Sequence, residues 1–204
     1  MSLEAKPVAS RWLRPAFIAV TTLFAVLGVA VWLFGSPPAM QQAAAIGGPF
    51  TLLDGNGRPV TDQTFLGKYM AVYFGYTFCP DVCPTTLNDL SQALDMLGSK
   101  AQTIAPVFIT LDPARDTPDI VKQYTASFSP RLVGLTGSAE QIAAVAREYR
   151  VYYAPHKTGP NPGDYTVDHS SIIYLMGPTG RFVGIIASDS GANRMVTQLA
   201  GYLS

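Results

Sequence analysis

The sequence predicts an α/β domain of three layers with a mixed central sheet, preceded by one N-terminal transmembrane helix. Short apolar runs alternate with stretches of helical apolar spacing, a hairpin and a last helix follow, and a long uncharged run comes first. The 204 residues are 48% hydrophobic and only 14% charged, so the chain has ample apolar surface to bury and disorder is not expected. Its 14 basic residues balance 14 acidic ones, which gives no electrostatic footprint for nucleic acid.

A membrane anchor is predicted at residues 15–35. No charged residue occurs between Arg14 and Asp54, and the apolar run that begins at residue 15 has the length of a helix that crosses the hydrocarbon core. Basic residues flank only its N-terminal side, which places residues 1–14 in the cytoplasm and the rest of the chain outside. A cleaved signal peptide is the alternative, although the apolar part of a signal peptide is usually shorter.

The segment after the anchor, residues 36–46, shows no periodicity and is predicted to be a linker. The outward domain then spans residues 47–204. Its net charge is −2, because the chain as a whole is neutral and its N-terminal part carries +2, from three basic residues against one acidic residue. We expect a single-pass protein of the bacterial inner membrane, with its C-terminal domain in the oxidising periplasm.

Strands are predicted where short apolar runs are bounded by loop residues. Four such runs occur before the last third of the domain, at 50–53, 70–75, 104–111 and 132–135. Two more runs, 171–176 and 181–186, flank a Gly-Pro-Thr-Gly turn and are predicted to form a hairpin.

Helices are predicted where apolar residues recur three and four positions apart. The first carries an apolar stripe from Leu87 and ends at Gly98, and the second begins at Pro118, a residue suited to a first helical turn. The third, at 138–149, opens with the capping-box pair Ser138 and Gln141. A last amphipathic helix carries the apolar residues Ala192, Met195, Val196, Leu199 and Leu203.

The only two cysteines, Cys79 and Cys83, stand four positions apart at a predicted strand-to-helix junction. A helix N-terminus lowers the pKa of a thiol, and this spacing lets two sulfurs converge on one point. Two soft thiolates select Cu(I), with zinc as the main competitor. A redox-active dithiol pair is equally compatible with the spacing, whereas a structural disulfide closing so small a loop would stabilise the fold little.

Histidine and carboxylate residues elsewhere offer further candidates. His169 precedes the predicted hairpin, and Asp168 beside it could fix the orientation of its imidazole. His156 lies in a polar stretch predicted to be a solvated loop. Asp112 follows the buried run 104–111 and is a weaker candidate for a supporting role, while Asp116 or Thr117 is expected to cap the helix that follows.

Three motifs in order behind one N-terminal anchor resemble the Sco/SenC family: Cys79-Pro-Asp-Val-Cys83-Pro, Asp112-Pro-Ala-Arg-Asp-Thr-Pro and Asp168-His169-Ser. The resemblance implies a thioredoxin-like fold, copper binding, and a role in assembling the dinuclear copper centre (CuA) of cytochrome c oxidase subunit II. Carried over to this chain, it makes Cys79, Cys83 and His169 the copper ligands, with His169 brought to the sulfurs across 86 positions. The cysteine pair would also form a redox-active disulfide that must be reduced before copper loads.

The resemblance therefore implies a membrane-anchored metallochaperone rather than an enzyme. Its expected partners are subunit II, an upstream periplasmic copper donor and a thiol reductant. Two other functions stay open: an extracytoplasmic thiol–disulfide reductase that maintains the cysteines of the oxidase copper site, and a redox or copper sensor. A peroxidase is less compatible, because the threonine-rich approach to a peroxidatic cysteine is missing. A zinc site of two cysteines and one histidine is chemically allowed.

Overall fold

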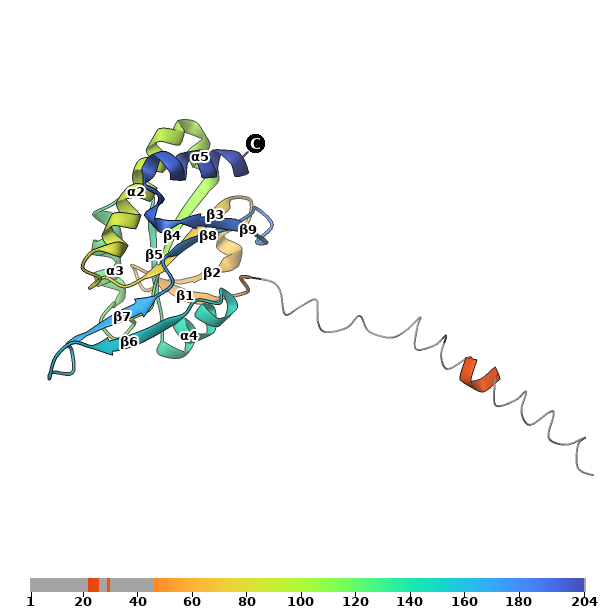
Figure 1. The fold of residues 1–204 in the computed structure, drawn as a ribbon, viewed down its shortest axis with the longest axis horizontal. Coiled ribbons are helices and arrows are strands. Elements are labelled where there is room, and N and C mark those ends of the chain that lie inside the picture. The colour runs from red at the N-terminus through yellow and green to blue at the C-terminus, as the bar shows by residue number, and fades with distance from the viewer. Residues whose placement is uncertain (1–21, 26–28, 30–45, 204) are drawn as a thin grey trace, which may run out of the picture. The chain divides into compact units, whose positions relative to one another are not determined.

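A computed structural model describes residues 22–25, 29 and 46–203 (Figure 1). The chain divides into two compact units, Met1–Ala44 and Ala45–Ser204. Most of the predicted membrane segment at 15–35 lies outside the described residues, and so does most of the predicted linker. Among the residues that are described, no helix has both the length and the apolar composition needed to cross a membrane.

A seven-stranded mixed sheet forms the centre of the second unit. The strand order is β2-β1-β5-β4-β3-β8-β9, in which β3, β4 and β5 run parallel and the other pairings are antiparallel. The strands are β1 (Thr51–Asp54), β2 (Pro59–Thr61), β3 (Tyr69–Gly75), β4 (Ile104–Thr110), β5 (Val133–Thr136), β8 (Ile172–Met176) and β9 (Phe182–Ala187). The predicted mixed sheet is thereby confirmed.

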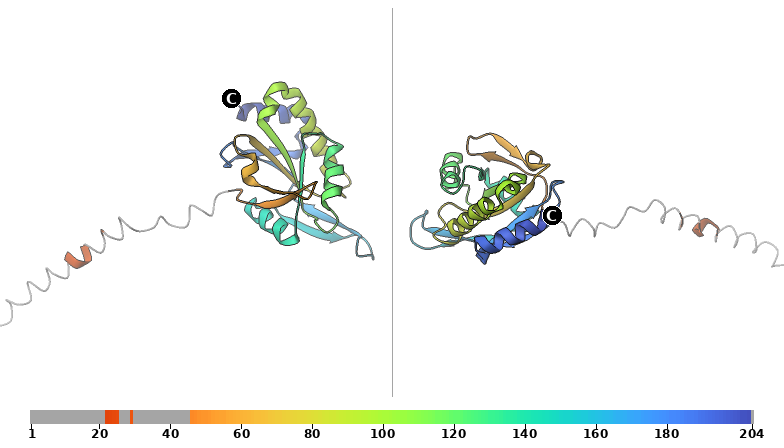
Figure 2. Two further views of the ribbon diagram at one scale, coloured as in Figure 1. Left: turned by 180° about the vertical axis from the view of Figure 1, so that it is seen from behind. Right: turned by 90° about the horizontal axis from the view of Figure 1, so that it is seen from above.

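Helices cover both faces of this sheet. They are α2 (Val82–Leu97), α3 (Pro118–Ala126), α4 (Ala139–Glu148) and α5 (Ala192–Tyr202), with short 3-10 turns η2 (Asp62–Phe65), η3 (Gly98–Thr103) and η4 (Ser188–Ser190). Phe108 packs on Tyr124 of α3, whereas Phe74 packs on Tyr149, which directly follows α4. Tyr73 and Phe108 are paired neighbours in β3 and β4, so they share one face, while Phe74 points to the other. Helices α2 and α5 contact each other and lie side by side (Figure 2).

The local signals in the sequence predict most of these elements. Helix α4 has the expected capping box, in which Ser138 accepts from the backbone of Gln141 and the side chain of Gln141 accepts from the backbone of Ser138. Helix α2 ends at Gly98, whose φ of 59° lies in the region that glycine adopts most easily. Pro118 stands in the first turn of α3, as predicted.

A second sheet of two strands was not predicted. β6 (Tyr153–Lys157) and β7 (Tyr165–His169) pair antiparallel and extend from the domain as a hairpin (Figure 1). The short strand β2 was also missed. The stretch around His156 looked like a loop because it is polar and contains Pro155, but a two-stranded edge tolerates both features. His156 is exposed on β6, and His169 ends β7 instead of preceding β8 directly.

Candidate metal centre

Both cysteines lie at the junction between the central strand β3 and helix α2, at the edge of an α/β sheet where ligands commonly bind. Cys79 belongs to the cysteine loop (residues 76–81), and Cys83 is the second residue of α2. The backbone N–H of Cys83 donates to Cys79 Sγ at 3.4 Å. The sulfur of Cys79 therefore accepts a donor that the first turn of the helix leaves unsatisfied, which favours a thiolate there. Both thiols are free of disulfide bonds.

Cys83 is fully buried, whereas Cys79 is partly exposed. The sulfur of Cys83 occupies the space that a side chain at Gly75 would need: a Cβ built there would stand 2.8 Å from Cys83 Sγ. The same Cβ would lie 3.1 Å from the Phe108 ring and 3.3 Å from the Tyr73 ring. The end of β3 thus leaves one sulfur-sized space beneath the helix and directs the Cys83 thiol into it.

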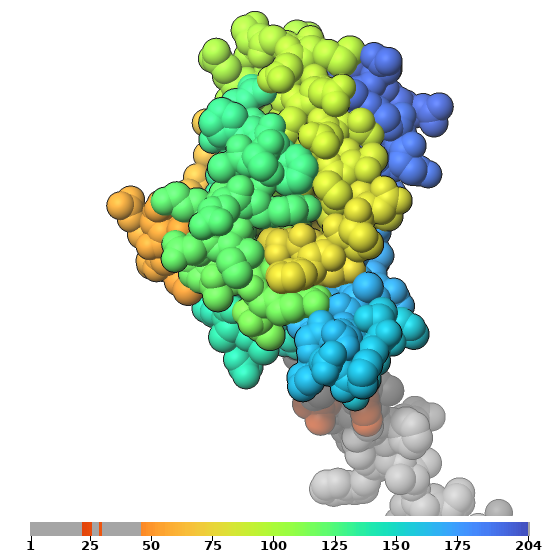
Figure 3. Space-filling view, turned by 90° about the vertical axis from the view of Figure 1, so that its left-hand side faces the viewer, coloured from red at the N-terminus to blue at the C-terminus, as the bar shows by residue number. Residues whose placement is uncertain are grey.

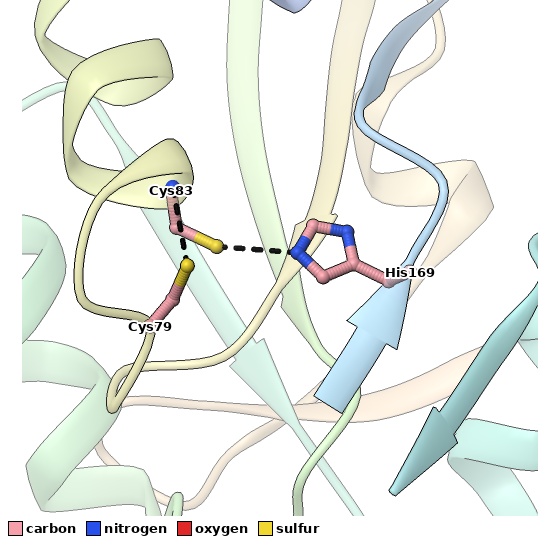
Figure 4. A group of neighbouring side chains, drawn as sticks. All are labelled: Cys79, Cys83 and His169. Carbon is pink, nitrogen blue, oxygen red and sulfur yellow. Dashed lines mark hydrogen bonds between the residues drawn. The ribbon is translucent and has the colours of Figure 1, made fainter. Parts of the chain in front are cut away.

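His169 reaches the cysteines from the end of β7 (Figure 4). Its Nε2 lies 3.4 Å from Cys83 Sγ, and its Nδ1 lies 3.2 Å from the carbonyl oxygen of Ser170. Because a carbonyl oxygen only accepts, Nδ1 carries the proton and Nε2 presents its lone pair toward the sulfurs. The rings of Tyr73 and Tyr76 approach the imidazole edge to face, each with its centroid 6.1 Å away.

The three ligand atoms of Cys79, Cys83 and His169 all lie within 4.8 Å of one another. Two sulfurs and one imidazole nitrogen form a soft donor set that suits Cu(I), and zinc accepts the same atoms. No other group of three potential ligands is this close among the described residues. The donor set therefore fits a copper ion, and a single ion could contact all three side chains after small adjustments.

The pKa values of the two thiols are shifted in opposite directions. Hydrogen bonds from the Cys83 thiol and from the backbone amides of Cys83 and Asp81 lower the pKa of Cys79 to about 4. The thiolate on Cys79 and the burial of the group raise the pKa of Cys83 well above its usual range. In the metal-free protein Cys79 is thus a thiolate at neutral pH while Cys83 keeps its proton. Binding a metal through both sulfurs must release that proton.

Asp168 does not orient the imidazole as expected. It is exposed, and it lies on the opposite side of β7 from its neighbour His169, because successive side chains of a strand alternate between faces. The carbonyl of Ser170 holds Nδ1 instead. A backbone carbonyl fixes the tautomer of a histidine as well as a carboxylate does.

Asp112 is buried at the end of β4, but its hydrogen bonds go to residues outside the ligand set. It pairs with the Nε of Arg115, and its Oδ1 accepts from the hydroxyl of Tyr165 at 2.8 Å. Tyr165 begins the strand that His169 ends. Any support that Asp112 gives to the site therefore acts through β7.

Asp116 and Arg115 lie near the site, and sequence reasoning assigned neither of them a role in it. The carboxylate of Asp116, fully buried, accepts from the backbone N–H of Thr77 at 3.0 Å and from the Thr77 hydroxyl at 2.5 Å. It also accepts from the Thr110 hydroxyl at 2.5 Å. Asp116 thus holds the cysteine loop, while Thr117 stands at the N-cap of α3. No local signal distinguishes this role from helix capping, because Thr77 is 39 positions away.

The site opens on the molecular surface. Figure 3 shows the cysteine loop, in yellow, between the green segment around α3 and the blue β6–β7 hairpin. Two apolar side chains beside the ligands are exposed there, Phe78 at 59% and Val82 at 43%. Cys79 can therefore be reached by a partner molecule, while Cys83 lies behind it.

Comparisons with known proteins all point to one family. A model of the SCO1/SenC family matches residues 38–204. Protein sco1 of Schizosaccharomyces pombe is 41% identical over 159 residues, which cover 77% of this chain and 60% of that protein. The mitochondrial SCO1 homolog of Mus musculus is 44% identical over 163 residues, covering 78% of this chain and 55% of the mouse protein. This chain thus spans little more than half the length of these curated relatives.

Solved structures match the domain over most of its length. The structure of Bradyrhizobium japonicum ScoI with copper bound is 46% identical with a TM-score of 0.71, covering 78% of this chain and 99% of that one. Yeast Sco1 with copper bound is 41% identical with a TM-score of 0.70, covering 78% of this chain and 88% of the yeast chain. These likenesses confirm the thioredoxin-like α/β fold that the motifs predicted.

Proposed function

Because this chain belongs to the SCO1/SenC family, we propose that it is a membrane-anchored copper-binding metallochaperone. In this role it helps to assemble the dinuclear copper centre (CuA) of cytochrome c oxidase subunit II. The observation that carries the proposal is the convergence of Cys79, Cys83 and His169, whose ligand atoms lie within 4.8 Å of one another. Copper-bound structures of two relatives support it.

Copper is the cargo of this site, and the three side chains suit a cargo that must leave again. Two thiolates and a neutral imidazole hold Cu(I) with three donors, which leaves coordination space for a ligand of the recipient. The partly exposed Cys79 is the sulfur that a recipient can replace first. The buried Cys83 and the oriented His169 retain the ion until the exchange is complete.

We base the proposed location of the protein on its N-terminal sequence. A helix at residues 15–35 would anchor the chain in the bacterial inner membrane, with residues 1–14 in the cytoplasm and the domain 47–204 in the periplasm. Tethering both proteins to one membrane raises the effective concentration at which the domain meets subunit II. An upstream periplasmic copper donor would supply the ion, and a thiol reductant would keep the cysteine pair in the dithiol form that binds it.

The test is an anaerobic titration of the protein with Cu(I) against a competing chelator, followed by mixing with the metal-free copper domain of subunit II. We expect one copper per chain and its transfer to the recipient. Cys83→Ser should lose tight binding, and Arg131→Met, a surface change far from the cysteines in the fold, should bind as the wild type does. One-to-one binding without transfer would contradict the chaperone role.

A thiol–disulfide reductase is the second candidate, and the asymmetry of the two cysteines favours it. The Cys79 thiolate could attack a disulfide of the oxidase copper site and form a mixed disulfide. Cys83, once deprotonated, would then attack Cys79 Sγ, releasing the substrate dithiol and leaving a Cys79–Cys83 disulfide for the thiol reductant. This reaction does not need an imidazole ligand. Two results together would select the reductase: metal-free His169→Ala reduces disulfides at the wild-type rate, and the copper-loaded wild-type protein fails to transfer copper to subunit II.

A further inference from the structure

Arg115 contacts both the cysteine loop and the β6–β7 hairpin, although it is not a ligand. It lies in the β4–α3 loop (residues 111–117), where its Nε pairs with the buried carboxylate of Asp112. Its Nη1 donates to the carbonyl oxygens of Gly163 at 3.3 Å and Tyr165 at 3.0 Å, both in or beside the strand that carries His169. One side chain therefore joins the main domain to the β6–β7 hairpin.

The aromatic contacts of Arg115 extend this connection to the cysteine loop. Its guanidinium carbon lies 3.6 Å from the ring centroid of Tyr165, on the hairpin. The same carbon lies 4.8 Å from the ring centroid of Phe78 and 5.8 Å from that of Tyr76, both in the cysteine loop. A guanidinium at these distances is attracted to the faces of aromatic rings. Arg115 thus lies between the segment that carries Cys79 and the strand that carries His169.

The hairpin is not part of the main sheet, so side-chain contacts hold it against the domain. β6 and β7 pair only with each other in the described structure, and an isolated two-stranded hairpin is marginally stable in water. Tyr165 is held at three points: its ring and its carbonyl oxygen by Arg115, and its hydroxyl by Asp112 at 2.8 Å. His169 ends the same strand, so fixing Tyr165 also fixes the direction from which the imidazole arrives.

The same loop holds the other ligands in place. Asp116, the residue after Arg115, accepts two hydrogen bonds from Thr77 in the cysteine loop. The β4–α3 loop is therefore joined on one side to the segment that carries Cys79 and on the other to the strand that carries His169. The separation between sulfur and nitrogen depends on both connections.

We propose that Arg115 is a positioning residue for His169: it sets the distance between the imidazole and the two sulfurs, and thereby how well the site holds Cu(II) relative to Cu(I). This inference rests on the proposed copper site. Two thiolates alone retain Cu(I), a soft ion, whereas Cu(II) prefers imidazole nitrogen among its ligands. Displacement of His169 should therefore weaken Cu(II) binding much more than Cu(I) binding.

The test compares Arg115→Met with Arg131→Met. Arg131 makes an ion pair with Asp95 at 2.9 Å elsewhere on the domain, so it controls for the loss of one paired arginine. We expect Arg115→Met to weaken Cu(II) binding at least tenfold, the usual cost of losing a residue that orients a ligand, and to reduce the nitrogen hyperfine coupling in the electron paramagnetic resonance spectrum. Cu(I) affinity should fall much less, and Arg131→Met should match the wild type in every measurement.

A double-mutant cycle separates positioning from a general loss of structure. If Arg115 acts through His169, adding Arg115→Met to His169→Ala should cost no further Cu(II) affinity. A full additional loss in the double variant, or wild-type Cu(II) binding in Arg115→Met, would overturn the proposal. Tyr165→Phe, which removes only the hydroxyl contact to Asp112, should give a smaller loss in the same direction and keeps the test valid if Arg115→Met folds poorly.

A measurement without metal completes the experiment. Hydrogen exchange of the backbone amides in β6 and β7 should become faster in metal-free Arg115→Met and stay unchanged in Arg131→Met. Unchanged exchange in the hairpin would also overturn the proposal. Failure of the wild-type protein to bind either copper ion would instead refute the proposed function, so the two failures are distinguishable.

Discussion

Cys83 Sγ and His169 Nε2 lie 3.4 Å apart although 86 positions separate the two residues. The sulfur comes from the first turn of α2 and the imidazole from the end of a hairpin outside the main sheet. Nδ1 of the imidazole faces the carbonyl of Ser170, so the free lone pair of Nε2 points at the sulfur. The ligand atoms therefore converge in an arrangement that suits a single metal ion.

The first prediction concerns the imidazole. His169→Ala should keep a stoichiometry of one Cu(I) per chain, because Cys79 and Cys83 remain, and should lose less affinity for Cu(I) than for Cu(II). The charge-transfer spectrum of the Cu(II) form should change or disappear, since a nitrogen ligand is lost. Chelator competition and optical titration measure both effects. Unchanged affinity together with an unchanged spectrum would show that the imidazole is not a ligand.

The second prediction concerns the reactivity of Cys79 in the metal-free protein. Its pKa of about 4 lies far below the ordinary thiol value of about 8.5. Because the thiolate is the reactive form, the rate of alkylation of Cys79 should rise through pH 4 and stay flat from pH 5 to 8. Cys83, fully buried and with its pKa raised, should stay unmodified over that range. Mass spectrometry after timed alkylation identifies the modified residue.

The control for this profile is Cys83→Ala. The hydrogen bond from Cys83 is the largest cause of the lowered pKa of Cys79, so removing that thiol should move the midpoint of the profile toward 8.5. A midpoint that stays near 4 in this variant would assign the effect to the backbone amides of Cys83 and Asp81 instead.

The third prediction concerns Asp116, whose pKa is raised by burial. A carboxyl with a folded-state pKa above its unfolded value binds its proton more tightly when folded. Its contribution to stability is full below the unfolded value of about 4 and is lost as the pH rises through the folded value. The free energy of unfolding of the wild type, relative to that of Asp116→Asn, should therefore fall as the pH rises above about 4.

Chemical denaturation at a series of pH values measures this difference. Asp119→Asn, a change at an exposed carboxylate in the first turn of α3, serves as the control. A pH-independent difference between the wild type and Asp116→Asn would mean that hydrogen bonds from Thr77 and Thr110 cancel the cost of burial.

Local signals predicted the cysteine half of the site, and long-range contacts determined the rest. The convergence of Cys79 and Cys83 at a helix N-terminus follows from their spacing and from the strand before them. The sequence marked His169 as a candidate because it precedes the predicted hairpin, but only the resemblance to a family joined it to the cysteines, because nothing near it in sequence indicates where β7 lies. Asp168 is not the partner of His169, because successive side chains of a strand alternate between faces and β7 was not predicted to be a strand.

The supporting residues could not be predicted for the same reason. Asp116 has the sequence context of a helix cap, but its partner Thr77 lies 39 positions away. Arg115 has the context of a surface loop, yet its guanidinium lies on the ring of Tyr165, 50 positions further along. The contacts of Arg115 with Tyr165 exist only once the hairpin has folded against the domain, and a polar hairpin containing proline gives a weak strand signal.

The last prediction concerns Gly75, which limits the space available to the Cys83 sulfur. Its φ is not positive, so alanine can adopt the backbone conformation. The new methyl group would stand 2.8 Å from Cys83 Sγ and 3.1 Å from the Phe108 ring, closer than such atoms normally approach. Because the aromatic ring is held in the core, the sulfur should move. Overpacking of this kind costs about 1–3 kcal/mol of stability.

Gly75→Ala should therefore weaken Cu(I) binding at least tenfold, although it leaves all three ligands in place, because the displaced sulfur no longer converges with Cys79 and His169. Chelator competition measures the affinity, and thermal denaturation confirms that the variant is folded. Gly201→Ala is the matched control, since no atom outside its own chain neighbours and helix backbone lies within 4 Å of its added methyl group, and helical alanine stabilises relative to glycine. Wild-type copper affinity in folded Gly75→Ala would show that the position of the Cys83 sulfur does not depend on Gly75.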